Sequence, residues 1–331
     1  MEFEHCFGCM AHTKEYPCPF CGFDPAKQER QEDALKLGTI LKGRYAVGMA
    51  LARSGGSVTY VGWDLALERK IAIREYFPIG QVSRRPGRGC DLQWDTSVQA
   101  ETARTTGMDM FRKEAEMAAR LGEIPQIARI WDVFEENETA YIVMDFVEGE
   151  TIGDRLKRTG PLSWEESKKR FFPVIETMEK VHQAGQIHQG LCPDSLMLQP
   201  DGTVKILSPD CPKGLQAGCD ACSIQETKSG FSPPELYIQM DGSGTWTDVY
   251  AMAATLYCAL TGKIPPSAVD RMEEDTTDWI LLQRRDIPGN VSAALQKAMI
   301  LKAGMRTQTM AEFLKDLQSG SGKRRFPFTR K

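Results

Sequence analysis

The sequence predicts an α+β fold, with a strand-rich part followed by a helix-rich part and a small cysteine-rich segment in front of both. Three observations lead to this prediction. Residues 41–78 alternate apolar stretches with turn residues, Ser163 opens a long amphipathic helical pattern, and four cysteines lie within the first two dozen residues. With 331 residues the chain is longer than one ordinary domain, so we expect more than one compact unit.

The composition is that of a globular protein with no global attraction to polyanions. A net charge of −4 gives the chain no overall electrostatic reason to bind nucleic acid or an anionic membrane. The longest nearly apolar stretch, 249–260, is too short to cross a bilayer, and the N-terminus lacks a basic region followed by an apolar one. We therefore expect no membrane span, no nucleic-acid partner and a cytoplasmic location. The basic tail, 319–331, is expected to be solvated.

The first cysteines form two C-x-x-C pairs separated by eight residues, Cys6 with Cys9 and Cys18 with Cys21. Each pair can place two thiolates on one tetrahedral ion, and so short a segment buries too little apolar surface to fold without such a staple. Four sulfur ligands close the coordination shell, so we expect a structural zinc ion and no catalytic one. The alternative is two disulfides, which a cytoplasmic chain disfavours because its thiols stay reduced.

Residues 1–24 resemble a zinc ribbon, whose second knuckle commonly reads C-P-x-C-G, as Cys18 to Gly22 does here. The resemblance implies a role in protein interaction. His5 and His12 are expected to be exposed polar residues that do not bind the metal. The following segment, 25–37, is charged and poor in bulky apolar groups, which predicts a linker or a short helix.

Between Leu41 and Pro78 the apolar stretches are split by Ser54-Gly-Gly-Ser57, which predicts a hairpin followed by a third strand. Two motifs here resemble bacterial serine/threonine protein kinases. Leu51–Tyr60 is similar to the kinase glycine-rich loop, and Ile71–Pro78 is similar to the V-A-I-K-E-Y-F-P strand of a bacterial subgroup.

The resemblance continues through the C-terminal half. Tyr141–Gly149 is similar to the last strand and the hinge of the kinase N-lobe, and Gln186–Met197 resembles the catalytic loop. Ser163-Trp-Glu-Glu166 is a capping box that opens a helix ending near His182. Val204–Leu207 resembles the strand that leads to the D-F-G motif.

The resemblance implies a two-lobed protein kinase-like fold over about 38–318, with a β-rich N-lobe at about 38–148 and a helical C-lobe at about 149–318. Residues 81–107 are polar and rich in Gly and Arg, so we expect an inserted surface loop. Within it, the arginines of 84–88 are expected to face solvent.

The resemblance also implies which positions carry the chemistry, and in this chain they are substituted. The usual loop glycines are Ala52, Ser54 and Ser57. The phosphate-pairing lysine, the catalytic Asp, the catalytic-loop Lys, the magnesium-binding Asn and the D-F-G Asp are replaced by Arg74, Gly190, Cys192, Ser195 and Ser208. Arg74 is expected to pair with Glu114, the αC glutamate by resemblance. The framework positions keep the family's residues: His188, Glu235, Asp248 and Arg306.

This division predicts a pseudokinase, a kinase-like module with no intact catalytic residue that acts as an intracellular signalling scaffold or allosteric partner of other proteins. A missing general base alone costs about 10²- to 10⁴-fold in rate. Two alternatives stay open. One is an active, atypical kinase that transfers the ATP γ-phosphate to Ser or Thr of a protein; the other is a nucleotide-sensing switch. A nucleic-acid binder led by the ribbon is disfavoured, because the knuckles lack interleaved basic and aromatic residues.

Two further sites are weighed against plain packing. An adenine pocket would bind ATP weakly and without magnesium, although completion of the core is the favoured role for the same residues, Thr59, Ala72, Met144, Asp145, Val147 and Met197. A second metal site is conceivable at Cys192, Cys211, Cys219 and Cys222, but we favour free thiols there and one zinc per chain.

Overall fold

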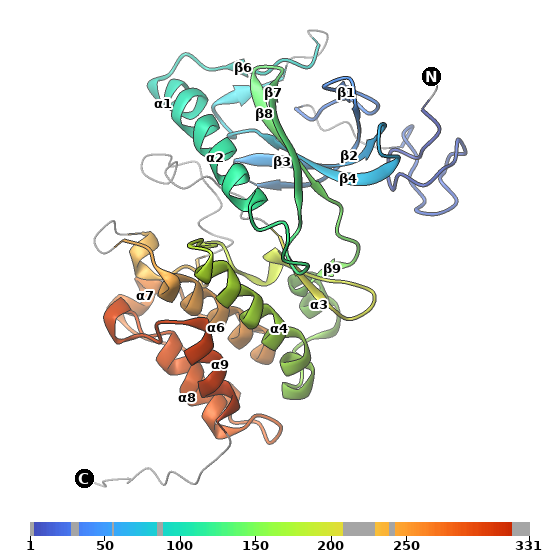
Figure 1. Ribbon diagram of the computed structural model, residues 1–331. Helices are drawn as coiled ribbons and strands as arrows, with labels where there is room; N and C mark the ends of the chain where they lie inside the picture. The colour runs from blue at the N-terminus through green and yellow to red at the C-terminus, as the bar shows by residue number, and fades with distance from the viewer. Residues whose placement is uncertain are drawn as a thin grey trace, which may run out of the picture. The chain divides into compact units, whose positions relative to one another are not determined.

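The computed structural model describes residues 3–27, 33–54, 56–84, 89–207, 229–237 and 242–319 (Figure 1). The described residues up to Val147 form one compact unit, and those from Glu148 onwards form another. The first is built mainly of strands and the second mainly of helices. The predicted two-lobed protein kinase-like fold is therefore confirmed, and we call the units the N-lobe and the C-lobe.

The N-lobe is built on a six-stranded antiparallel sheet. In spatial order its strands are β1 (Ile40–Leu41), β2 (Tyr45–Ser54), β3 (Ser57–Asp64), β4 (Arg69–Tyr76), β8 (Thr139–Asp145) and β7 (Ile130–Glu136). The predicted hairpin and third strand are β2, β3 and β4. Their alternating apolar residues fill one core together with Leu35, which comes from the predicted linker and is 5% exposed. The linker therefore ends inside the N-lobe.

One helix, α2 (Met108–Ala119), packs on this sheet through Phe111 and Ala115. The segment before it was expected to be a surface loop, and this prediction is wrong for much of its length. It contains β5 (Val82–Ser83) paired with β6 (Gln93–Trp94), then α1 (Val98–Thr102) and a π-helical turn, η1 (Ala103–Gly107).

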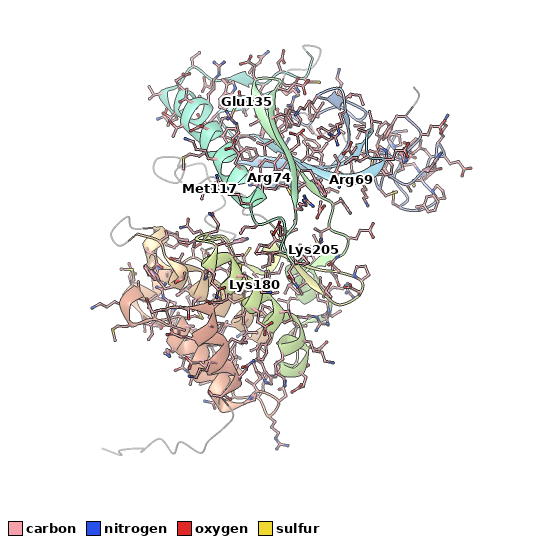
Figure 2. The ribbon with its side chains drawn as sticks, viewed as in Figure 1. Arg69, Arg74, Met117, Glu135, Lys180 and Lys205 are labelled. Atoms are coloured by element: carbon pink, nitrogen blue, oxygen red, sulfur yellow. The ribbon has the colours of Figure 1, made fainter. Side chains whose placement is uncertain are left out.

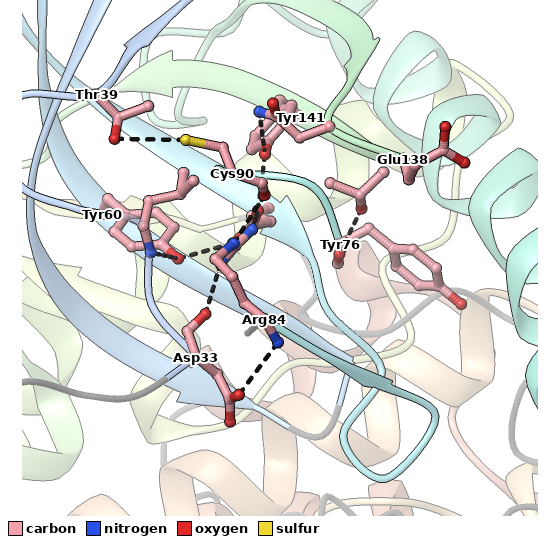
Figure 3. A network of polar contacts seen from close by, with 12 residues as sticks. Asp33, Thr39, Tyr60, Tyr76, Arg84, Cys90, Glu138 and Tyr141 are labelled. Carbon is pink, nitrogen blue, oxygen red and sulfur yellow. Dashed lines mark hydrogen bonds and ion pairs between the residues drawn. The ribbon is translucent and has the colours of Figure 1, made fainter. Parts of the chain in front are cut away.

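Arg84, expected to face solvent, is instead 6% exposed in a buried polar network (Figure 3). Its Nη2 donates to Glu75 Oε1 at 2.5 Å, and the hydroxyls of Tyr60 and Tyr141 donate to the same carboxylate at 2.7 and 2.8 Å. Burial, and then the charge of Glu75, raise the pKa of both tyrosines, so they remain donors. Glu75 is 0% exposed. A carboxylate so buried requires a cation, and Arg84 supplies it.

The C-lobe surrounds α6 (Thr245–Thr261), in which every side chain from Thr247 to Leu260 is buried. Its other helices are α3 (Ile152–Thr159), α4 (Trp164–Gln183), α7 (Ala268–Glu273), α8 (Gly289–Ala298) and α9 (Met310–Gln318). Short 3-10 turns are η2 (Pro193–Ser195), η3 (Pro234–Leu236), η4 (Trp279–Leu282) and η5 (Ala303–Met305). A small sheet has the order β11 (Val204–Ile206), β10 (Leu196–Leu198), β9 (Glu150–Thr151).

The start of α4 follows the predicted capping box. Ser163 Oγ accepts from the Glu166 amide at 3.2 Å, and Glu166 Oε2 accepts from the Ser163 amide at 3.1 Å. Both bonds satisfy donors that a helix N-terminus otherwise leaves open. No helix in the described part of the chain is both long and apolar enough to span a bilayer.

Candidate functional site

The four cysteines predicted to bind zinc lie together at one point of the N-lobe. Cys6 Sγ lies 3.7 Å from Cys21 Sγ, Cys9 Sγ lies 3.8 Å from Cys18 Sγ, and all four sulfurs are within 4.8 Å of one another. Zn–S bonds of about 2.3 Å in a tetrahedron separate the sulfurs by about 3.8 Å, whereas a disulfide needs about 2.05 Å. The donor set therefore fits a metal ion, and it is the one such group found among the described residues.

Backbone amides favour the thiolate at Cys18, whereas burial raises the pKa of the Cys6 and Cys21 thiols. The Gly8 amide donates to Cys6 Sγ at 3.2 Å. Burial acts to raise the pKa of the Cys18 thiol, but the amides of Cys21 and Phe20 outweigh it and lower that pKa to about 7. A thiolate is the form that binds metal.

The two histidines of the ribbon differ from each other. The ring of His12 is exposed, as expected. His5 is only half-exposed, contrary to the prediction, because its ring packs against the Trp63 ring of β3, with the ring centroids 4.0 Å apart. Neither histidine belongs to the metal-spaced group.

The hairpin at the glycine-rich-loop position is closed onto the strand beside it. Ser54 and Ser57 are register partners at its tip. Ser57 is 2% exposed, and its hydroxyl accepts from Arg74 Nε at 3.1 Å. Arg74 is 4% exposed, and its guanidinium lies over the ring of Phe111 at 5.3 Å (Figure 2). Thus the residue that replaces the third loop glycine and the residue that replaces the lysine are bonded to each other.

Glu114, the predicted partner of Arg74, lies three residues after Phe111 in α2. Residues three apart leave a helix on the same face. The face of α2 that meets the Arg74 guanidinium is therefore the face that carries Glu114, and their ion pair stays a prediction.

The predicted adenine-pocket residues of the N-lobe lie on neighbouring strands. Ala72 in β4 is the register partner of Met144 in β8, and the two are 8% and 7% exposed. Both pack in one core cluster with Phe111. Thr59 lies in β3 opposite Arg74. A nucleotide pocket stays a prediction for these residues and for the remaining members, Asp145, Val147 and Met197.

In the C-lobe, Asp248 of α6 holds the catalytic-loop segment. Its carboxylate accepts from the backbone amides of His188 and Gln189 at 2.7 and 2.6 Å. His182 Nε2 lies 2.9 Å from the same carboxylate, which is 0% exposed. Gln189 has a φ of +58°. Such a backbone is tolerated by a non-glycine residue when its surroundings determine it, as these bonds do.

The imidazole of His188 ties the loop to the end of β11. Its Nδ1 accepts from the Gly190 amide at 3.2 Å. The proton then resides on Nε2, which donates to the Leu207 carbonyl at 2.8 Å. These bonds fix the loop backbone, and Gly190, the position that the resemblance assigns to the catalytic Asp, carries no side chain.

The other substituted loop positions are satisfied within the loop. The Ser195 hydroxyl donates to the Cys192 carbonyl and accepts from the Cys192 amide, both at 2.9 Å. Cys192 is 3% exposed and Ser195 8%. Asp194, the nearest carboxylate in sequence, accepts from Thr151 Oγ1 at 3.4 Å and approaches Gly153 so closely that a Cβ there would lie 2.0 Å from Oδ1. Its charge is therefore placed at the start of α3.

A second framework pair joins Glu235 to Arg306. Arg306 Nη1 and Nη2 donate to the two Glu235 oxygens at 2.7 and 3.2 Å, and Arg306 is 3% exposed. Its remaining donors reach the carbonyls of Trp246, Ile300 and Leu301. Ser208, Cys211, Cys219 and Cys222 lie outside the described residues, so the second metal site and the D-F-G position stay predictions.

Residues 96–329, more than half of the chain, match the protein kinase domain family. The chain belongs to the protein kinase family. A probable serine/threonine-protein kinase of Clostridium perfringens is 25% identical over 85% of this chain and 39% of its own length. PrkC of Bacillus subtilis is 25% identical over 69% and 32%, and PknA of Mycobacterium tuberculosis is 26% identical over 84% and 61%. The match thus covers less than two thirds of the length of these relatives.

Two solved structures share the protein kinase fold. PpkA-294 in its apo form superposes with a TM-score of 0.73 at 24% identity, over 86% of this chain and 100% of that one. Rad53 1-466 in complex with AMP-PNP superposes with a TM-score of 0.62 at 18% identity, over 82% and 64%. Together with the family match, these superpositions establish the fold of this protein kinase domain.

Proposed function

We propose that this protein kinase domain is a pseudokinase, which works by binding protein partners as a signalling scaffold or allosteric module and does not transfer phosphate. The observation that carries the proposal is the loop around Gly190. Its backbone is held by hydrogen bonds to Asp248 and His188, yet Gly190, the position that the resemblance assigns to the base, offers no carboxylate to take the proton of a substrate hydroxyl. Loss of a general base costs about 10²- to 10⁴-fold in rate.

Two other contacts support the proposal. The Ser195 hydroxyl is hydrogen-bonded to the backbone of Cys192, and a neutral serine is a poor substitute for a magnesium ligand. Arg74 is bonded to Ser57 and stacked on Phe111, so its guanidinium is engaged where the family's lysine reaches phosphates. Asp194 is engaged at the start of α3, which disfavours it as a replacement base.

The proposal includes one structural zinc ion, bound by Cys6, Cys9, Cys18 and Cys21. The metal would close its shell with four thiolates and hold the knuckles in shape. Reduced thiols at this spacing suit a cytoplasmic location. ATP would bind weakly and independently of magnesium, at the adenine-pocket residues alone.

An active serine/threonine kinase is the second candidate, because the named relatives are serine/threonine-protein kinases. A phosphotransfer assay separates the two. The purified chain is incubated with labelled ATP and magnesium or manganese, with itself and a generic protein as acceptors. We expect incorporation equal to that of Arg74→Ala. Incorporation by the native chain that Arg74→Ala abolishes would establish the active kinase.

A further inference from the structure

The cysteine-rich ribbon and the N-lobe sheet meet at one point of β2. The Met49 amide donates to the Phe7 carbonyl at 2.8 Å. At Gly48 a Cβ would lie 2.3 Å from Met10 Cε and 2.5 Å from the Phe7 carbonyl oxygen. Only glycine permits so close an approach. Phe7 and Met10 belong to the first knuckle or follow it directly, so this knuckle is the part of the ribbon that contacts β2.

The contact coincides with a β-bulge. Val47 pairs with Gly62, but the next pair is Ala50 with Tyr60, so β2 has one residue more than β3 between these two pairs. A bulge releases a backbone group from the ladder. The Met49 amide lies within this irregular stretch and donates to the Phe7 carbonyl. The knuckle therefore contacts β2 at its bulge.

Beyond this point the outer edge of β2 is open. β1 pairs with Tyr45 and Ala46, and Thr39 accepts from Val47. From Met49 to the hairpin tip, the described part of the chain gives this edge no further backbone hydrogen bond. The knuckle therefore gives this edge its last backbone hydrogen bond before the tip, where Ser57 bonds Arg74; beyond it, Arg53 contacts Asp33 and lies over the Phe77 ring.

The first knuckle is held by backbone hydrogen bonds, and a metal ion would add to them. The Met10 amide donates to the Cys6 carbonyl at 2.8 Å, the Cys6 amide donates to the Ala11 carbonyl at 2.9 Å, and Met10 has a φ of +61°. Phe7 lies between two of the thiols, Cys6 and Cys9, so an ion bound to both would fix the residues that flank it. The position of the Phe7 carbonyl would then depend on the metal together with the packing of the Phe7 ring on Phe3.

We propose that the ribbon is a metal-dependent clamp on the β2–β3 hairpin: an occupied four-thiol site holds the bulge at Gly48 and Met49 and, through β2, keeps Ser57 on Arg74. Loss of the metal frees the hairpin. The inference rests on the structural zinc of the proposed function and is independent of whether the domain transfers phosphate. It gives the ribbon a role within its own chain, because the metal content of the ribbon would determine how firmly the hairpin is held.

Hydrogen exchange of the full chain tests the clamp, with zinc content measured on the same samples. Chelation should raise the exchange rates of Met49 and of the hairpin amides from Arg53 to Val58 by at least about tenfold. The amides of β8, such as Val143, and those of α6 should keep their protection. Unchanged protection at Met49 after complete zinc loss would overturn the inference. An equal loss of protection across β8 would also overturn it, because the metal would then stabilise the whole N-lobe and not the hairpin in particular.

A matched pair of variants separates docking from metal binding. Phe7 and Phe20 occupy the two knuckles, but Phe7 stacks on Phe3 at 5.3 Å and lies against Gly38, whereas Phe20 is 71% exposed. Phe7→Ala should keep one zinc and still raise exchange at Met49, and Phe20→Ala should leave exchange unchanged. Equal exchange in both variants contradicts the clamp. A native chain without zinc refutes both the clamp and the zinc proposal, while the phosphotransfer result stands by itself.

Discussion

Replacement of Asp248 by Ala should destabilise the C-lobe much more than a substitution at Gly190 in the catalytic loop. The carboxylate is fully buried and bonds three groups, the amides of His188 and Gln189 and the imidazole of His182. Alanine leaves all three polar groups without an acceptor. An unsatisfied buried group costs about 1–3 kcal/mol, and breaking a buried charged network costs about 3–5 kcal/mol in total. That is a large share of a domain stability of about 5–15 kcal/mol.

The control is Asp316→Ala, which removes an aspartate from an exposed pair with Lys297 and should cost about 0–1 kcal/mol. Hydrogen exchange of the α6 amides measures the opening free energy of the C-lobe without assuming that both lobes unfold together. Gly190→Asp should leave this free energy close to that of the native chain. If Asp248→Ala falls within about 0.5 kcal/mol of the control, the carboxylate does not hold the loop and the reasoning fails.

In the N-lobe, Arg84→Ala leaves Glu75 buried without a cation and should lower the free energy of unfolding in urea by about 3–5 kcal/mol. The control, Arg104→Ala, removes one partner of an exposed ion pair and should lower it by about 0–1 kcal/mol. Equal losses in the two variants would contradict the buried network. The Arg271 hydrogen bond lowers the pKa of Asp275 to about 2, below its ordinary 3.8. Its stabilising effect is therefore complete above about pH 4 and is lost as pH falls toward 2. Because Asp275 is partly exposed, acid titration of the native chain should show a loss of only about 1 kcal/mol from this group, and Asp275→Asn, which has no carboxyl to protonate, should lack that loss. ATP should raise the melting temperature little and equally with magnesium or EDTA, and a large shift that EDTA removes would point to a metal–nucleotide site.

Much of the fold could be predicted because it is encoded locally. Apolar stretches split by turn residues predict β2 to β4, and the capping box at Ser163 predicts the start of α4. The resemblance marked Asp248 as a framework residue, and its carboxylate accepts from the backbone amides of His188 and Gln189. These features depend on neighbouring residues or on a family motif.

Contacts between distant segments could not be predicted in the same way. Arg84 lies among polar neighbours in the sequence, so it was expected on the surface, and only Glu75, the one acid of β4, indicates that a buried cation is needed. The docking of the ribbon depends on a backbone bond between Phe7 and Met49, which has no side-chain signature. Gly48 is the one sequence feature that relates to this contact, because a Cβ at this position would clash with Met10.

The pattern of kept and lost residues follows from what each contributes to folding. Asp248 and Arg306 satisfy backbone groups in the interior, so the domain needs them whether or not it transfers phosphate. A general base at position 190 contributes to the barrier of a reaction and to no buried bond, and glycine there costs the fold little because the amide already bonds His188. The proposed loss of the base would therefore leave the conformation of this loop intact, because the bonds of Asp248 and His188 hold its backbone. The proposed scaffold would depend on that conformation.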